Sequence, residues 1–297
     1  MKLKNINIAL ISVFATIALL SCTAPIDINT RNSEPVIVIY GQITDENKHQ
    51  YIRITSSSPY FDKKTNAVVS DAKVVITSSQ GIEYPFVYEK DGYYKSENSF
   101  FGVPNITYNL TVEVDFDKDN EMEIYEASTT LLPVVSVDSA DVKLLSIMGY
   151  RHFALNFYMQ DPPETNNYYL CRFFINDSVS NSMLSEYIIT EDRMYNGEYI
   201  DGATITYFED ATDEKNLTAP GADEKNNFMM SPGDIIRLQF SNIEKGYYNF
   251  INQCISEKYG ENPFFGGPPS NITTNLSNGA VGYFTGFCIH EKTAIAP

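Results

Sequence analysis

The sequence predicts a mainly β protein, built from two β-rich domains with one helix in the C-terminal half. Three features of the 297-residue chain support this prediction. Short runs of β-branched and aromatic residues recur along it, separated by turn-forming residues at intervals of about eight to twelve residues. Its 21 tyrosines and 18 phenylalanines mostly alternate with polar residues, as in half-buried strands. Only one stretch has helical periodicity.

Residues 34–133 are expected to form the first domain, a β-sandwich of about seven short strands. The pair Asp91-Gly92 lies between two strand-like runs and is typical of a tight hairpin turn. An acidic loop at Asp115 ends the last clear run. The expected strands include residues 35–40, 50–56, 71–77, 83–89 and 107–114, with a return strand that begins at Tyr93.

Residues 134–297 are expected to form the second β-rich domain, after a boundary at Leu132-Pro133-Val134. Strands are expected at residues 153–159, 168–175 and 234–240, and a final strand is expected to end near His290. The prolines of Asp161-Pro162-Pro163 make a rigid connection between the first two. Residues 177–227 are polar and are expected to be rich in loops. Residues 243–259 have helical spacing, with Gly260 at the stop position.

The N-terminus resembles a bacterial lipoprotein signal. Lys2 and Lys4 precede an apolar run, and Leu19-Leu20-Ser21 leads directly into Cys22. A run of roughly 15 apolar residues suits secretion but is short for spanning a bilayer. We therefore expect residues 1–21 to be a cleaved signal peptide, Cys22 to be lipidated, and residues 22–33 to be a tether. An ordinary cleaved signal and an uncleaved anchor helix are the alternatives.

Lipidation would hold the mature chain at a membrane. Each buried methylene contributes about 0.8 kcal/mol, so two or three acyl chains make desorption negligible. Thr23 follows Cys22, and no aspartate stands at that position to retain the protein in an inner membrane. We therefore expect an outer-membrane location.

The charge of the chain excludes one class of partner. Lysine and arginine total 21 against 38 aspartates and glutamates, a formal net charge of −17. Such a surface repels phosphate backbones and anionic headgroups, so nucleic-acid binding is not expected. Membrane contact should come from the lipid alone.

Three cysteines remain after Cys22: Cys171, Cys254 and Cys288. An odd number allows at most one intramolecular disulfide. Cys171 lies among aromatic residues and is expected to be buried. Cys254 and Cys288 could be neighbours, and whether they are bridged stays open at this point. No CxxC pair or cluster of cysteine and histidine is present, which argues against structural zinc.

No sequence motif indicates an enzyme. The three histidines, His49, His152 and His290, lie near no nucleophile motif, and the GxSxG, HExxH and P-loop patterns are absent. Carboxylates are abundant, so a surface hydrolase that uses an acidic pair remains an alternative. We expect a protein that binds rather than catalyses, without a cofactor.

The acidic loop has the spacing of a calcium site. Asp115, Asp117, Asp119 and Glu126 occupy the first, third, fifth and twelfth positions of an EF-hand-like loop. Asn120 stands where that loop needs glycine, and the flanking residues favour strands. The alternative interpretation is a solvated hairpin tip.

Tyrosines in the polar region 177–227 are candidates for ligand contact. Tyrosine combines a large apolar face with a polar hydroxyl, a pairing common at binding surfaces. The candidates are Tyr195, Tyr199 and Tyr207.

The first domain resembles transthyretin-like and carboxypeptidase-regulatory-like β-sandwiches. The resemblance covers about a third of the chain and implies a fold without a function. It rests on Ala72-Lys73-Val74, Gly92-Tyr93-Tyr94, Gly102 and Tyr108-Asn109-Leu110.

The whole mature chain resembles the Bacteroidetes outer-membrane lipoproteins called domain of unknown function 4249. The matching features are the Cys22 signal, residues 35–41, Asp161-Pro162-Pro163 followed by Asn167-Tyr168-Tyr169, the tyrosine-rich helix, residues 262–264 (NPF), residues 268–272 (PPSNI) and residues 279–284 (GAVGYF). Members are often encoded beside TonB-dependent outer-membrane receptors. The resemblance implies a location and a neighbour, and it transfers no catalytic residue.

The leading hypothesis is a non-enzymatic outer-membrane lipoprotein that assists a TonB-dependent receptor in nutrient uptake. A structural or adhesive surface lipoprotein is the first alternative, and a surface hydrolase is the second.

Overall fold

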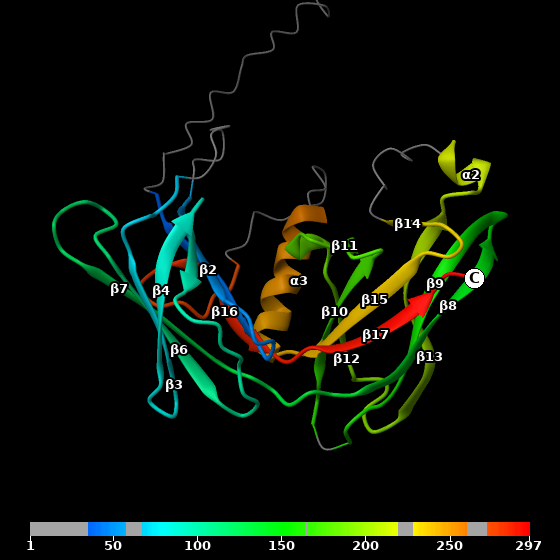
Figure 1. The fold of residues 1–297 in the computed structure, drawn as a ribbon, viewed down its shortest axis with the longest axis horizontal. Coiled ribbons are helices and arrows are strands. Elements are labelled where there is room, and N and C mark those ends of the chain that lie inside the picture. Colours follow the sequence, from blue (N-terminus) through cyan, green and yellow to red (C-terminus); the bar gives the residue numbers. More distant parts are fainter. Residues whose placement is uncertain (1–34, 58–66, 164, 219–227, 260–271) are drawn as a thin grey trace, which may run out of the picture. The chain divides into compact units, whose positions relative to one another are not determined.

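The computed structural model describes residues 35–57, 67–163, 165–218, 228–259 and 272–297. Residues 35–297 form one compact unit. The expected signal peptide, the tether and Cys22 lie outside the described residues, as does residue 260 at the expected helix stop. Within the described part, no helix has both the length and the apolar character needed to cross a bilayer. The prediction of a mainly β fold is confirmed, because the described chain consists mostly of strands in several sheets (Figure 1).

The first sheet has eight strands in the order β16-β1-β2-β5-β4-β3-β6-β7. Seven of them lie between residues 34 and 133, as the sequence predicts. Inward-facing side chains such as Ile39, Ile54 and Leu110 form its core. The strands are β1 (Ile37–Thr44), β2 (Tyr51–Ser56), β3 (Lys73–Ser78), β4 (Glu83–Lys90), β5 (Tyr93–Ser96), β6 (Thr107–Val114), β7 (Glu123–Thr130) and β16 (Val281–Phe287).

Strand β16 departs from the expected division of the chain at residue 133. Its place in the sequence assigns it to the second domain, yet it pairs in parallel with β1, from Val38 opposite Val281 to Thr44 opposite Phe287. Local alternation predicts a strand but not its partner, because the pairing joins residues far apart in the sequence. The first sheet is therefore completed by the C-terminal part of the chain.

The outer strands of this sheet, β7 and β16, are connected by side chains. The Gly286 N–H donates to Thr129 Oγ1 at 2.8 Å, and Asn275 Nδ2 donates to the Ser128 carbonyl at 3.0 Å. Glu244 accepts from Thr129 Oγ1 at 2.6 Å. These bonds satisfy polar groups at strand edges that would otherwise be open for pairing.

Two further sheets enclose a second core. One has the order β11-β10-β15-β17 with β12 also paired to β10, and the other has the order β14-β13-β9-β8. Phe153, Phe173, Phe208 and Phe240 are buried between them. The strands are β8 (Val137–Ile147), β9 (Tyr150–Gln160), β10 (Tyr168–Ile175), β11 (Ser178–Val179), β12 (Ile188–Glu191), β13 (Tyr199–Asp210), β14 (Met229–Met230), β15 (Ile235–Asn242) and β17 (His290–Ile295).

The region 177–227 is more regular than expected. It contains β11, β12 and the twelve-residue strand β13, together with the short helices η1 (Leu184–Glu186) and α2 (Glu214–Leu217). The pairing of β13 with β9 is irregular between Asp201 and Ala203 and between Thr204 and Thr206. Such bulges interrupt the alternation of apolar and polar residues, so the strand does not stand out in the sequence.

The predicted helix is confirmed as α3 (Lys245–Tyr259). Its buried face consists of Tyr247, Phe250 and Ile251, spaced as neighbours on one side of a helix. These side chains pack with Leu170 of β10 and with Tyr283 and Phe287 of β16. The helix thus contributes to a core shared with strands of both parts of the chain.

Candidate functional site

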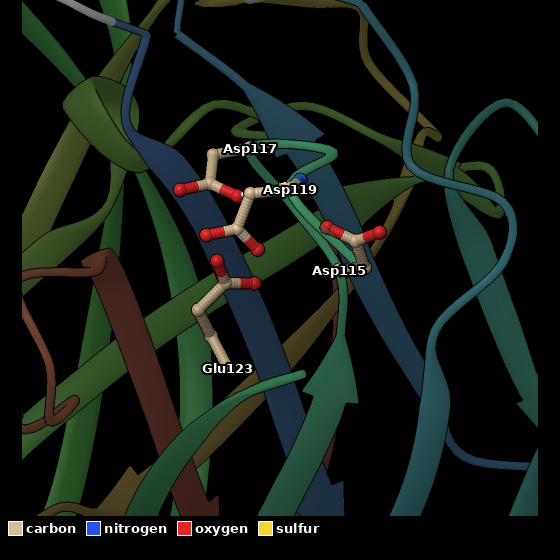
Figure 2. Close-up of side chains that lie close together, drawn as sticks. All are labelled: Asp115, Asp117, Asp119 and Glu123. Carbon is tan, nitrogen blue, oxygen red and sulfur yellow. Dashed lines mark hydrogen bonds between the residues drawn. The ribbon is translucent and has the colours of Figure 1, made fainter. Parts of the chain in front are cut away.

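The acidic loop between β6 and β7 brings four carboxylates together (Figure 2). Carboxylate oxygens of Asp115, Asp117, Asp119 and Glu123 lie within 4.8 Å of one another. The loop's own backbone uses several of them, because Asp119 N–H donates to Asp117 and Glu121 N–H donates to Asp119. A calcium ion takes six to eight oxygens, so these groups would supply only part of its shell.

Glu126, the fourth expected calcium ligand, is not part of this group. Glu123 takes that place, and its Oε2 accepts from the Phe116 N–H at 2.7 Å. Glu126 is exposed on β7, where its backbone N–H donates to Ser277 Oγ at 2.7 Å. Side chains alternate along a strand, so Glu123 and Glu126 point to opposite faces. The EF-hand spacing assumes a helix after the loop, whereas β7 follows here.

The three candidate tyrosines are not brought together. Tyr195 lines a cavity of about 310 Å³ with Tyr169 and Asp192. Tyr199 and Tyr207 lie near opposite ends of β13 and are about half exposed. Eight residues of a strand span about 26 Å, so these two tyrosines cannot contact one small ligand together.

A cleft that the sequence does not predict lies between the first sheet and the strand β10. We call this cavity of about 460 Å³ the Arg172 cleft. Its first wall is the outward face of β1, β2 and β5, which is opposite to the isoleucines of the core. The lining side chains of this wall include Tyr40, Gln42, Tyr51, Arg53 and Tyr93.

The second wall consists of residues from β10 to α3. Arg172 projects from β10, Leu184 and Tyr187 come from η1 and the residue after it, and Phe250 comes from α3. Gly282 of β16 completes the lining. The described lining residues include no histidine, cysteine, aspartate or glutamate, so this cavity presents aromatic faces and guanidinium groups.

Two aromatic rings lie beside the Arg172 guanidinium. Its central carbon lies 5.4 Å from the ring centroid of Tyr187 and 5.8 Å from that of Phe174. Its Nε is buried and has no hydrogen-bond partner. No carboxylate among the described residues forms an ion pair with it. A charged group without an acidic partner is costly to hold in a partly buried place, which makes the Arg172 side chain, where it lines the cleft, a candidate for contact with an anionic ligand.

A second cavity of about 250 Å³ adjoins the cleft at Gln42 and Arg172. Arg237 lines this second cavity, but its charge is already satisfied. It donates to Glu291 at 2.7 Å, and Gln239 donates to the same carboxylate at 2.8 Å. Arg172 therefore differs from its neighbour Arg237, because no acidic partner for it lies in the part of the chain that the structure describes.

The hydroxyl groups of Tyr40 and Tyr247 form a hydrogen bond of 2.7 Å beside the cleft. Burial raises the pKa of both phenols, while the positive charge of Arg172 acts in the opposite direction. The two tyrosines are thus neutral at pH 7.

The cysteines in the described residues are free thiols. Burial raises the pKa of Cys171 to about 12, and burial together with Asp45 raises the pKa of Cys288 to about 12. Cys254 is partly buried in α3, and no disulfide joins it to Cys288. A thiol with so high a pKa is a poor nucleophile at neutral pH.

Comparison with known proteins identifies the family. A model of the domain of unknown function DUF4249 matches residues 23–293. The chain belongs to the DUF4249 family. This confirms the family resemblance that the sequence shows. No curated protein matches this DUF4249 chain.

Two solved structures have low similarity to this DUF4249 chain. A two-domain fibronectin type-III segment of chicken tenascin is 8% identical with a TM-score of 0.19. The match covers 66% of this chain and 86% of that segment. A mutant Salmonella alpha-2-macroglobulin is 8% identical with a TM-score of 0.23, and the match covers 90% of this chain but only 15% of the macroglobulin. At these TM-scores neither likeness bears on fold or function.

Proposed function

We propose that this DUF4249 protein is a lipid-anchored binding protein of the outer membrane that assists a TonB-dependent receptor in nutrient uptake. The observation that carries the binding role is the Arg172 cleft. It combines a guanidinium that has no carboxylate partner among the described residues with several tyrosine rings in a cavity of about 460 Å³, a size typical of small-ligand sites.

The composition of the cleft favours binding over catalysis. Proton transfer and nucleophilic attack need a group whose pKa lies near the working pH. The described lining residues of the cleft include none of the histidines, cysteines, aspartates and glutamates that most often do this chemistry, but they include tyrosines and arginines. Such side chains can hold and orient a ligand.

The membrane location rests on the N-terminal sequence. Lys2, Lys4, the apolar run and Leu19-Leu20-Ser21-Cys22 have the order of a lipoprotein signal. Receptor assistance rests on the resemblance to outer-membrane lipoproteins encoded beside TonB-dependent receptors.

Lipidation and location can be tested with the full chain, expressed in a bacterium that sorts lipoproteins and labelled with radioactive palmitate. Wild type should carry the label and fractionate with outer membranes, whereas Cys22→Ala should lose both. Cys254→Ala serves as the matched control and should behave as wild type. Label that persists in Cys22→Ala would contradict the lipid anchor.

Receptor partnership can be tested by purification from native outer membranes in mild detergent. A TonB-dependent receptor should co-purify with the wild-type chain. Recovery of a surface polymer without a receptor would instead favour an adhesive role, and turnover of glycans or peptides by the purified chain would favour a hydrolase.

A further inference from the structure

We infer that the Arg172 cleft binds a small ligand that carries a carboxylate beside a flat apolar face, such as an acidic sugar or the acidic end of a peptide. This inference rests on the proposed binding function and names the chemistry of its ligand. The contacts of the arginines, the aromatic lining and the size of the cavity lead to it.

The arginines of the described chain fall into two groups. Arg151, Arg193 and Arg237 each lie within 4.0 Å of a carboxylate: Asp210, Glu191 and Glu291 respectively. The two without such a partner among the described residues are Arg53 and Arg172, and both line the Arg172 cleft. In a chain with a formal net charge of −17, acidic partners are abundant, so an acid-free pair of arginines in one cavity is informative.

The surroundings of Arg172 are suited to a carboxylate. A guanidinium presents its N–H groups in a planar fork that matches the two oxygens of a carboxylate. The buried Nε of Arg172 has no hydrogen-bond partner, and the guanidinium carbon lies over the rings of Tyr187 and Phe174. A carboxylate in the cleft would meet the part of Arg172 that lines it and give its charge the acidic partner that the described residues do not provide.

Arg53 provides a second positive charge at the exposed side of the cleft. Its guanidinium lies 5.2 Å from the ring centroid of Tyr93, and its Nε is 3.5 Å from the Asp91 carbonyl oxygen. An exposed arginine contributes more to attraction and orientation of an anion than to its tight binding. The two arginines thus place positive charge on both walls.

The tyrosines supply the flat apolar surface. Tyr51 and Tyr93 lie edge to face with ring centroids 6.4 Å apart, and each is 39% exposed. Exposed aromatic rings of this kind stack on sugar rings and on planar peptide groups. The volume of about 460 Å³ suits a ligand of one to a few units rather than a polymer.

Binding can be tested by titration calorimetry with the full lipidated chain in mild detergent. The probes are digalacturonate and a glutamyl dipeptide. Each is compared with the derivative in which its carboxylates are replaced by amides. We expect one carboxylate probe to bind and its amide to bind at least about tenfold more weakly, because the amide cannot make charge-assisted bonds to Arg172. The preferred probe distinguishes a saccharide source from a peptide source.

Variants locate the binding to the cleft. Arg172→Gln should weaken binding by about tenfold or more, and Arg53→Gln by a smaller factor. Arg193→Gln is the matched control for the loss of one positive charge, since Arg193 is 80% exposed and paired with Glu191, and it should bind as wild type. Tyrosine fluorescence should change on binding, because the chain has no tryptophan and the cleft is lined by tyrosines.

Three outcomes would overturn the inference: no binding of either carboxylate probe at about 10 mM, equal affinity for acid and amide, or wild-type affinity in Arg172→Gln. If Arg172→Gln does not fold, the affinity of Arg53→Gln for the carboxylate probe provides the second test. None of these outcomes would affect co-purification with a receptor or labelling at Cys22, so failure of the ligand assignment can be told from failure of the proposed function.

Discussion

Tyr40 of β1 and Tyr247 of α3 lie 207 positions apart in the sequence, and their hydroxyl oxygens are 2.7 Å apart in the structure. Tyr247 is fully buried, and its ring packs with Tyr283 and Phe287 of β16. The bond links the outward face of the first sheet to the helix that borders the Arg172 cleft. It thereby fixes the two walls of the candidate site.

Replacement of either tyrosine by phenylalanine should destabilise the protein, because the remaining buried hydroxyl loses its partner. We expect Tyr40→Phe and Tyr247→Phe each to reduce the free energy of unfolding by about 1–3 kcal/mol, measured by urea denaturation. The double variant leaves no unpaired hydroxyl and should cost clearly less than the sum. Strictly additive effects would show that the hydroxyls do not interact.

Substitution of Gly282 should disrupt the pairing of β16 with β1. A Cβ at this position would lie 2.1 Å from the Ile39 carbonyl oxygen, and the backbone φ of +109° is one that other residues rarely adopt. Gly282→Ala should therefore lower the free energy of unfolding by more than about 2 kcal/mol.

Gly279→Ala is the matched control for this experiment. Gly279 also has a positive φ, +73°, but no neighbouring atom lies within 4 Å of the place that an alanine methyl group would occupy. If Gly279→Ala costs as much as Gly282→Ala in urea denaturation, close approach of β16 to β1 is not the cause.

The acidic loop should gain stability when one of its charges is removed. The Asp119 N–H bond lowers the pKa of Asp117, but desolvation and the charges of Asp119 and Glu123 outweigh it and raise that pKa overall. A raised carboxylate pKa means that folding disfavours the ionised form at neutral pH. Asp117→Asn should thus unfold at a slightly higher urea concentration than wild type in EDTA.

Calcium distinguishes the two interpretations of this loop. If the loop is a solvated hairpin tip, the wild-type protein should have the same urea midpoint in EDTA and in millimolar calcium. A calcium-dependent rise in the midpoint of wild type that Asp117→Asn lacks would show that the carboxylate group holds the ion.

Glu291 should contribute to the loss of stability in acid. Burial favours its neutral form, but hydrogen bonds from Gln239 and Arg237 outweigh burial and lower its pKa below the ordinary 4.5. A carboxylate with a lowered pKa stabilises the fold above its unfolded pKa and loses this effect as the pH falls below it. Glu291→Gln should therefore reduce the difference between the urea midpoints at pH 7 and pH 3. An unchanged difference would contradict this role.

Local patterns predict much of the first sheet and the helix. The alternation in residues 107–114 predicts a strand with the bounds of β6, and the spacing in residues 243–259 predicts α3 to within two residues. In both, burial of one face follows from the period of the element. In β13 the bulges near Gly202 break this period, so the strand is not apparent.

The Arg172 cleft could not be predicted in the same way. Arg172 lies within the apolar run YYLCRFFI, where the pattern predicts a buried Cys171 and assigns Arg172 no role. A single charge inside a strand of aromatic residues was the available signal. Its significance depends on Tyr40 and Phe250, which the long-range pairing of β16 with β1 and the packing of α3 bring next to it.

The most direct test compares the small molecules that co-purify with wild-type, Arg172→Gln and Arg193→Gln chains from native outer membranes, identified by mass spectrometry after denaturation. We predict that an acidic compound is enriched with wild type and with Arg193→Gln and is absent from Arg172→Gln. Identical sets of compounds from all three chains would contradict the assignment of the Arg172 cleft as the binding site.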